Sequence, residues 1–278
     1  MKLFRHGPLG QERAGALDAE GRMRDLSLLI PDITPDWLAP AKLQALNAID
    51  LSRLPLVPQG TRIGAPVNGV RQFLAIGLNY RKHAQEAGLE LPAEPVFFTK
   101  AITSLAGPDD EVTLPEGSVQ GDWEVELGVV IGSVAQRVSE ADALAHVAGY
   151  VLANDVSERD WQIKRGGQWG KGKSFDGFGP IGPWLVTTDE LPDPQQIDIE
   201  LSVNGERRQQ STTADMIFSV ATIVSYLSQF MTLLPGDVII TGTPAGVGLG
   251  MKPQQFLKRG DVMELSGGVL GTQRQKVR

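Results

Sequence analysis

A group of acidic residues in this chain has a spacing that suits a buried metal ion. Glu124 and Glu126 lie in the segment from Trp123 to Ile131, whose residue types predict a β-strand. Alternate residues of a strand point to the same face, so both carboxylates should project together. The segment then becomes continuously apolar, which is typical of a strand covered on both sides. Two carboxylates on such a strand repel each other and lose hydration unless a cation holds them.

Asp155 extends this group to three carboxylates. It follows a second apolar run, residues 150–154, and could supply a third oxygen ligand. Oxygen ligands in a chain without cysteine favour a hard divalent ion, Mg²⁺ or Mn²⁺, over zinc. The alternative is that Glu124 and Glu126 line the solvent face of an edge strand.

A histidine and a glutamate could activate water. His83 and Glu86 are three residues apart, directly after an apolar strand segment. A carboxylate beside an imidazole orients the ring and raises its basicity, which suits a general base. A surface helix could produce the same pair without a function. The other two histidines, His6 and His146, lie in less promising surroundings.

Polar residues after Asp155 could contact a ligand. Residues 157–165 predict a helix, with Ser157 and Asp160 as a capping box that leaves Asp155 free. On this helix Arg159 and Gln162 share one face and could both meet a ligand. The alternative is a pair that faces solvent.

The segment Gly167–Ser174 fits the pattern G-x-x-x-x-G-K-[ST] of a phosphate-binding loop. That loop requires a strand before it and a helix after it, and neither is expected here. Its glycines instead let the backbone hold Lys173 close to a ligand. A mobile surface loop with a solvated lysine is the alternative.

The composition limits the class of protein. The chain has 278 residues, 41% hydrophobic and 21% charged, with a formal net charge of −7 and no cysteine. These values are those of an ordinary globular protein and argue against a nucleic-acid surface. No apolar run approaches the length of a membrane span, and the first residues lack the apolar segment of a signal peptide. We therefore expect a cytoplasmic protein with no membrane and no nucleic-acid partner.

The pattern of elements predicts a β-rich α+β fold in two parts. Residues 1–65 form a small N-terminal α+β domain, with short strands within 11–26, a helix at 36–49 and a linker rich in proline and glycine. In the second part, residues 66–278, we expect helices at 80–87, 139–147, 157–165 and 214–231. We expect strands there at 73–76, 96–99, 124–131, 149–154, 184–187, 197–203 and 237–241. This mixture lacks a regular βαβ alternation, which favours an α+β fold.

Together these residues resemble the fumarylacetoacetate hydrolase family. The resemblance runs from about Phe73 to the C-terminus. The N-terminal segments of the chain resemble a bacterial subgroup described as 2,4-diketo-3-deoxy-sugar-acid hydrolases or ureidoglycolate lyases. These segments are Met1–Arg5, Gly10–Glu12 and Gly21–Leu26. Six ordered motifs carry the family resemblance: Gly77–Tyr80 with His83 and Glu86; Phe97–Lys100; Glu124–Leu127; Asn154–Asp155 with Arg159 and Gln162; Gly172–Asp176; and Thr241–Gly248.

The resemblance implies a fold, a metal and an activity. It implies a C-terminal β-sandwich roll, a homodimer, and Mg²⁺ or Mn²⁺ held by Glu124, Glu126 and Asp155. The activity is hydrolysis of the C–C bond of a 2,4-diketo acid of the acylpyruvate type, giving pyruvate and a second acid. A 2,4-diketo-3-deoxy sugar acid such as 2,4-diketo-3-deoxy-L-rhamnonate or -fuconate is the expected substrate. The implied catalytic residues are His83, Glu86 and Lys173, and the implied substrate-binding residues are Lys100, Arg159, Gln162 and Thr243.

Other functions use the same fold and remain open from the sequence. A ureidoglycolate lyase would share the metal site and release glyoxylate and urea. An oxaloacetate decarboxylase would remove CO₂ from a β-keto acid. A non-catalytic binding protein would leave His83, Glu86 and Lys173 without a role.

Overall fold

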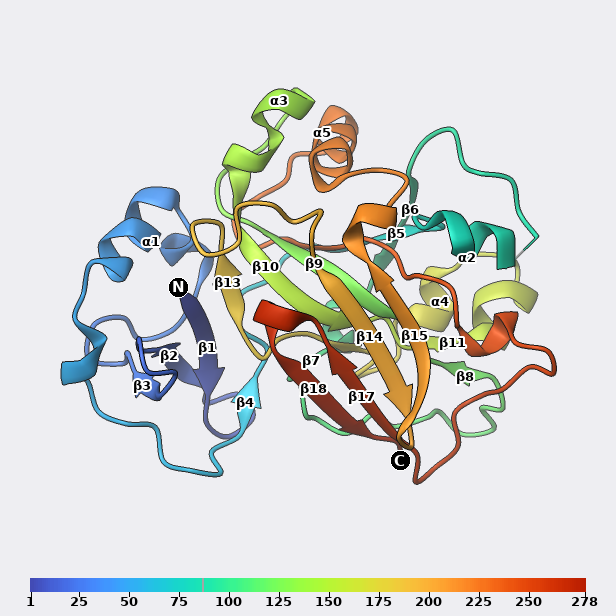
Figure 1. The fold of residues 1–278 in the computed structure, drawn as a ribbon, viewed down its shortest axis with the longest axis horizontal. Helices are drawn as coiled ribbons and strands as arrows, with labels where there is room; N and C mark the ends of the chain where they lie inside the picture. Colours follow the sequence, from blue (N-terminus) through green and yellow to red (C-terminus); the bar gives the residue numbers. More distant parts are fainter. Residues whose placement is uncertain (87) are drawn as a thin grey trace.

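Two β-sheets form most of the computed structural model, which describes residues 1–86 and 88–278 (Figure 1). The larger sheet has ten strands in the order β3-β2-β1-β13-β10-β9-β16-β5-β6, with β4 paired to β1. Its strands are β1 (Lys2–His6), β2 (Arg13–Leu17), β3 (Met23–Asp25), β4 (Ile63–Gly64), β5 (Phe73–Gly77), β6 (Val96–Lys100), β9 (Val125–Ile131), β10 (Val147–Asn154), β13 (Leu185–Thr187) and β16 (Val238–Ile240).

A four-stranded antiparallel sheet packs against one face of the large sheet (Figure 1). Its order is β15-β14-β17-β18, with β14 (Asp198–Val203), β15 (Glu206–Thr212), β17 (Val262–Ser266) and β18 (Thr272–Lys276). The structure also contains two short two-stranded sheets. In one, β7 (Leu105–Ala106) pairs with β12 (Gly179–Pro180), and in the other, β8 (Gly121–Asp122) pairs with β11 (Ser157–Glu158).

Five α-helices in the described part of the chain lie around the sheets. They are α1 (Pro40–Asn47), α2 (Arg81–Glu86), α3 (Glu140–Ala143), α4 (Gly170–Lys173) and α5 (Val220–Phe230). In α5 the buried residues Val220, Ile223, Val224 and Leu227 follow the helical period, and the Ser219 side chain caps the first turn. No helix among the described residues is long and apolar enough to cross a membrane.

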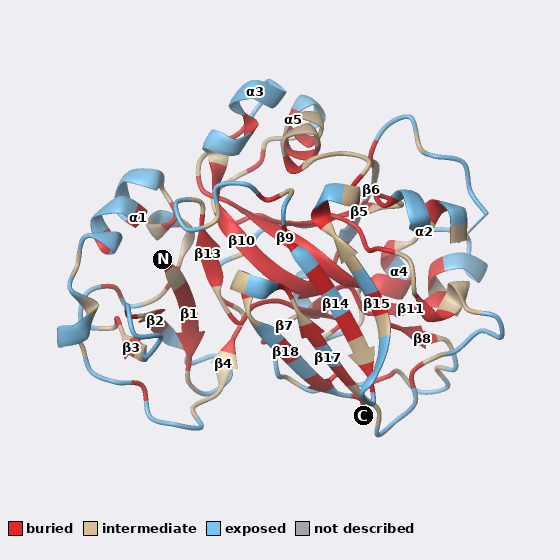
Figure 2. Cartoon of the chain, viewed as in Figure 1, coloured by how far each residue is buried: buried red, intermediate tan, exposed pale blue. Residues whose placement is uncertain are grey.

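Strands β9 and β10 run through the middle of the molecule and are buried along their whole length (Figure 2). Side chains of β9 alternate between two cores. Val125, Leu127 and Val129 face the core that includes the second sheet and α5. Val130 faces the other core, which it shares with Leu3 and other N-terminal residues. The prediction of a strand covered on both sides is therefore confirmed.

The fold class is confirmed as β-rich α+β, and the expected strands of the second part all occur within one or two residues of their predicted ends. Helix 80–87 is present as α2, and Ala87 lies outside the described residues. The N-terminal strands β1–β3 join the large sheet through the pairing of Leu3 with Leu185. The boundary at residue 65 stays a prediction.

The predicted helix at 157–165 and its capping box are wrong. Ser157 and Glu158 form strand β11, and a single π-helical turn follows at Asp160–Lys164. The Ser157 hydroxyl donates to the backbone oxygen of Asp155, so it does not cap a helix. Glu158 takes the capping role, because its carboxylate accepts a hydrogen bond of 3.0 Å from the Trp161 N–H.

Candidate active site

The three acidic residues meet because of the register between β9 and β10. Ala153 lies opposite Glu126, and the Asp155 N–H donates to the Glu124 backbone oxygen at 2.9 Å. Asp155 is therefore the cross-strand neighbour of Glu124, and all three carboxylates share one face. They are 5%, 1% and 1% exposed for Glu124, Glu126 and Asp155. The edge-strand alternative is wrong, since β9 lies between β10 and β16.

Two buried lysines contact these carboxylates. The short helix α4 places Lys173, whose Nζ lies 2.7 Å from Glu124 Oε2 and 2.6 Å from Asp155 Oδ2. From β6, Lys100 Nζ lies 2.5 Å from the other oxygen of Asp155 and 3.1 Å from the Phe178 backbone oxygen. Lys173 is only 2% exposed, so it is not the solvated lysine of a mobile surface loop.

The charges of the cluster shift the pKa values of Glu124 and Glu126 in opposite directions. Burial opposes ionisation of Glu124, but the positive charges of Lys173 and Arg159 outweigh it and lower its pKa to about 2. Burial, reinforced by the charges of Asp155 and Glu124, raises the pKa of Glu126 well above its usual value. Among the described residues, Glu126 receives one hydrogen bond, 2.7 Å from the Gly242 N–H. Glu126 is thus the carboxylate that the protein's own cations compensate least.

The cluster fits a divalent metal ion. Glu124, Glu126 and Asp155 each offer a carboxylate oxygen, and these oxygens lie within 4.8 Å of one another. An all-oxygen donor set suits Mg²⁺ or Mn²⁺. A cation beside Glu126 would also favour its ionised form, which the protein alone disfavours.

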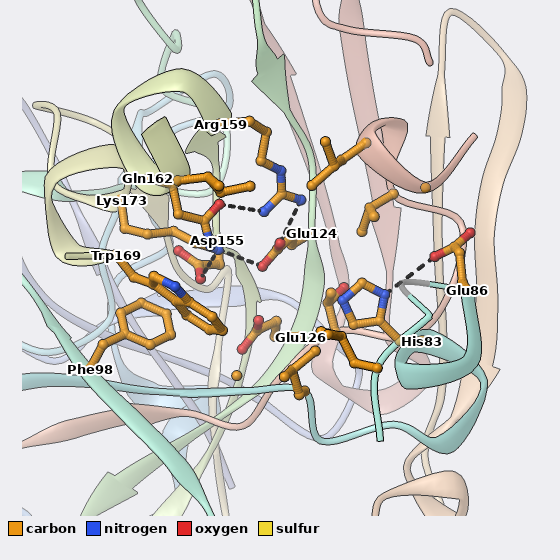
Figure 3. A pocket seen from close by; sticks show the side chains of 18 of the residues that line it. His83, Glu86, Phe98, Glu124, Glu126, Asp155, Arg159, Gln162, Trp169 and Lys173 are labelled. Carbon is orange, nitrogen blue, oxygen red and sulfur yellow. Dashed lines mark hydrogen bonds and ion pairs between the residues drawn. The ribbon is translucent and has the colours of Figure 1, made fainter. Parts of the chain in front are cut away.

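His83 and Glu86 form a contact on the other side of the carboxylates (Figure 3). His83 Nδ1 lies 3.3 Å from Glu86 Oε2, and both oxygens of Glu86 accept from the Gly246 N–H, at 3.1 and 3.2 Å. This arrangement assigns the proton to Nδ1 and leaves Nε2 as the basic nitrogen. Gly250 permits it, because a Cβ there would lie 2.4 Å from the Glu86 carboxyl carbon.

Arg159 and Gln162 are buried and face the cluster rather than solvent. Arg159 Nη1 donates to Gln162 Oε1 at 2.8 Å, and Arg159 Nη2 lies 2.7 Å from Glu124 Oε1. The guanidinium Nε also donates to Asp122 at 2.8 Å. Burial opposes the charged form of Arg159, but Asp122 and Glu124 outweigh it and raise its pKa. Arg159 is thus held charged and in a fixed orientation.

One cavity of about 510 Å³ collects most of the sequence-predicted residues. Nine of the ten line it: His83, Glu86, Glu124, Glu126, Asp155, Arg159, Gln162, Lys173 and Thr243. Lys100 is not among the lining residues and lies behind Asp155, so its contacts suit a role in positioning that carboxylate. The Thr243 hydroxyl is engaged as well, because it donates to the Val125 backbone oxygen at 2.9 Å.

Two buried side chains support the site and were not singled out from the sequence. Asp122 accepts from Arg159 and from the N–H groups of Gly248 and Leu249. The sequence does carry a signal for Asp122. It precedes Glu124 by two residues, and alternate residues of an extended segment point to the same side. Gln209 accepts from the Val125 N–H at 2.9 Å and donates to Thr243 and Pro244, each at 2.8 Å. Nothing local in the sequence marks it.

The phosphate-loop interpretation of Gly167–Ser174 lacks its structural context. The element before α4 is the π-helical turn at Asp160–Lys164, not a strand. The helix α4 ends at Lys173, so no helix follows the loop. Lys173 points at carboxylates, which a phosphate would have to displace.

Comparisons with known proteins find similar sequences along the chain. The sequence pattern described as "Fumarylacetoacetate (FAA) hydrolase C-terminal" matches residues 72–278. A protein of Burkholderia ambifaria, named as a hydrolase without a stated substrate, is 58% identical over 279 residues, 100% of this chain and 99% of its own.

Solved structures extend the comparison to the fold. A fumarylacetoacetate hydrolase from Exiguobacterium antarcticum is 37% identical and has a TM-score of 0.89, with 100% of this chain and 99% of that chain covered. A maleylpyruvate hydrolase from Sphingobium sp. SYK-6 is 27% identical and has a TM-score of 0.82, again with 100% and 99% covered. The chain therefore belongs to the fumarylacetoacetate hydrolase family.

Proposed function

We propose that this enzyme hydrolyses the C3–C4 bond of a 2,4-diketo acid of the acylpyruvate type, with Mg²⁺ or Mn²⁺ as cofactor. The single observation that carries the proposal is the cavity in which His83 with Glu86 faces the carboxylate cluster and Lys173. A structural relative named as a maleylpyruvate hydrolase supports the substrate class, since its name describes an acylpyruvate. The sugar-acid substrate expected from the sequence is one member of that class and stays a prediction.

The reaction adds one water and breaks one C–C bond. The oxygen of water attacks the C4 carbonyl carbon, and the C3–C4 electron pair leaves with C3. Protonation at C3 then gives pyruvate, and the acyl part leaves as a carboxylic acid. Attack needs a base near the water, and departure needs positive charge near the 2-oxo end.

His83 is the residue placed to act as the base. Its Nδ1 donates to Glu86, which is fixed by the Gly246 N–H, and among the described residues no hydrogen-bond partner occupies Nε2. Glu86 orients the imidazole and stabilises the imidazolium that forms when the ring takes the proton of water. His83 lines the cavity, so water and a bound diketo acid can both reach it.

The residues on the opposite side of the cavity bind the pyruvate half. A divalent ion held by Glu124, Glu126 and Asp155 would supply Lewis acidity for the carboxylate and 2-oxo oxygens. Lys173 places a positive charge beside the same carboxylates. Its burial in a site of low dielectric strengthens the stabilisation of negative charge that develops on the substrate. Arg159 and Gln162, held against each other, are placed to orient the substrate carboxylate.

Product analysis in labelled water tests the proposal. We expect 2,4-dioxopentanoate to yield pyruvate and acetate, with one ¹⁸O from H₂¹⁸O in the acetate carboxylate. The same preparation is assayed for glyoxylate from ureidoglycolate and for CO₂ from oxaloacetate. His83→Ala should abolish pyruvate release, whereas His146→Ala, at a histidine that contacts Ser133 away from the cavity, should not. Glyoxylate or CO₂ as the main product would contradict the proposal.

A further inference from the structure

We propose that the acyl group of the substrate is apolar, an alkyl or aryl chain without hydroxyl groups. This inference rests on the proposed acylpyruvate hydrolysis and specifies its substrate. It differs from the sugar acid that the sequence predicts, whose acyl part would carry several hydroxyl groups. Besides the active-site residues, the cavity is lined by several large apolar side chains.

The polar groups around the carboxylate cluster are already engaged. Lys173 contacts two carboxylates, and Arg159 contacts Asp122, Glu124 and Gln162. The Thr243 hydroxyl donates to a backbone oxygen and accepts from Gln209. These side chains serve the pyruvate half of the substrate. Hydroxyl groups on the acyl half would have few partners beside them.

Large apolar side chains form a second part of the cavity lining. We call this surface the apolar wall, formed by Leu78, Phe98, Ile163, Trp169, Leu249 and Met251. The residues come from separate segments: the end of β5, strand β6, the π-helical turn with the loop before α4, and the loop after β16. Ile163 at the rim is 49% exposed, so a large apolar side chain meets solvent beside the opening.

The aromatic part of the apolar wall is fixed in place. The rings of Phe98 and Trp169 pack edge to face, with centroids 5.7 Å apart, and lie beside Asp155 (Figure 3). Trp169 also packs on the backbone of Gly77, where a Cβ would lie 2.3 Å from its ring. Leu78, the next residue, has a left-handed backbone with φ of 55°. A residue other than glycine adopts this conformation at a cost, which indicates that its placement in the cavity matters.

Apart from the active-site residues, His83 and Glu86 included, the polar side chains along the described lining of the cavity belong to Lys252 and Gln254. Lys252 and Gln254 line the opening and are exposed, and Gln254 already donates to the Leu249 backbone oxygen. A hydroxylated acyl group would therefore lose its hydration along the apolar wall without gaining hydrogen bonds. That loss lowers the affinity for the hydroxylated chain by about tenfold or more. Each methylene that contacts the apolar wall instead raises the affinity for an apolar chain several-fold.

A matched pair of substrates tests the inference by turnover. We compare 2,4-dioxohexanoate with 5,6-dihydroxy-2,4-dioxohexanoate, which have the same carbon skeleton. We expect kcat/KM to be at least about tenfold higher for the unhydroxylated acid. Equal or higher kcat/KM for the dihydroxy acid would overturn the inference and leave the proposed function intact. If neither acid nor 2,4-dioxopentanoate releases pyruvate, the proposed function itself fails.

Binding of acids that cannot react gives a second measurement. 2-Oxohexanoate lacks the C4 carbonyl, so calorimetry with the metal-loaded enzyme reports affinity without turnover. We expect it to bind about tenfold more tightly than 5,6-dihydroxy-2-oxohexanoate. Ile163→Ser should reduce that ratio several-fold by removing part of the apolar wall, whereas Val134→Ser, at an exposed residue away from the cavity, should not change it. An unchanged ratio in Ile163→Ser together with tighter binding of the dihydroxy acid would overturn the inference.

Discussion

The N–H of Gly246 donates to both carboxylate oxygens of Glu86, although the two residues are 160 positions apart in the chain. Glu86 in turn contacts His83, three residues earlier on α2. The loop after β16 thus fixes the orientation of an imidazole that belongs to another segment. A short helix alone would not hold the pair, since six residues are too few for a stable isolated helix.

His83 and Glu86 should behave as one unit. Either His83→Ala or Glu86→Ala should lower kcat by roughly 10²–10⁴, the usual contribution of a general base. The double variant should be little worse than either single one, because members of a unit are not additive. Steady-state kinetics measures both effects. Metal content by elemental analysis should be unchanged, and its loss in His83→Ala would make the histidine a ligand instead.

Glu126→Gln should weaken metal binding and leave the metal-free protein folded. The change removes a charged ligand, so we expect the Kd of Mn²⁺ to rise by at least about tenfold. It also removes a buried carboxylate whose ionised form the protein disfavours. The Tm of the metal-free variant should therefore equal or exceed that of metal-free wild type. Wild-type Mn²⁺ affinity in this variant would exclude Glu126 as a ligand.

Lys173→Met should lower kcat strongly, because it removes the positive charge beside the developing negative charge of the pyruvate half. Oxalate resembles pyruvate enolate, so it should compete with substrate in wild type and inhibit the variant less. Lys171→Met, an exposed lysine of the same helix, is the matched control. Oxalate inhibition that is equal in all three proteins would remove Lys173 from this role.

Gln209→Ala should destabilise the start of β9. It leaves the buried Val125 N–H without its acceptor and the Thr243 loop without two hydrogen bonds. We expect a loss of about 2 kcal/mol or more in the free energy of unfolding, measured by urea titration. The exposed neighbour Gln210→Ala should change it by less than about 0.5 kcal/mol. Equal effects of the two substitutions would mean that Gln209 does not hold this junction.

The sequence predicted the apolar strands and the acidic cluster because both depend on short-range patterns. Glu124 and Glu126 share a face by strand alternation, and apolar runs mark β5, β9, β10 and β16. Strand β18 was missed since its inward positions are Gln273 and Gln275, whose amides pair with backbone and side-chain partners instead of apolar neighbours. An alternation of glutamines carries no hydrophobic period.

Long-range contacts account for the rest of what the sequence could not predict. Ser157 and Asp160 have the spacing of a capping box, yet pairing with Asp122 draws Ser157 into strand β11. Gln209 acts on β9 and on the loop after β16 from a strand of the second sheet. The roles of Ser157 and Gln209 depend on which distant segments the topology brings together. The spacing of residues along the sequence does not predict such contacts.

The pairing of β1 with β13 has a consequence for synthesis. Near Leu3, one edge of β1 is completed by residues around Leu185, which leave the ribosome far later. At typical translation rates that edge waits roughly 10 to 40 s for its partner. Over that time strand β1 presents unpaired backbone groups to other nascent chains. Aggregation of the unfinished polypeptide should therefore depend on how fast residues 4 to 187 are translated.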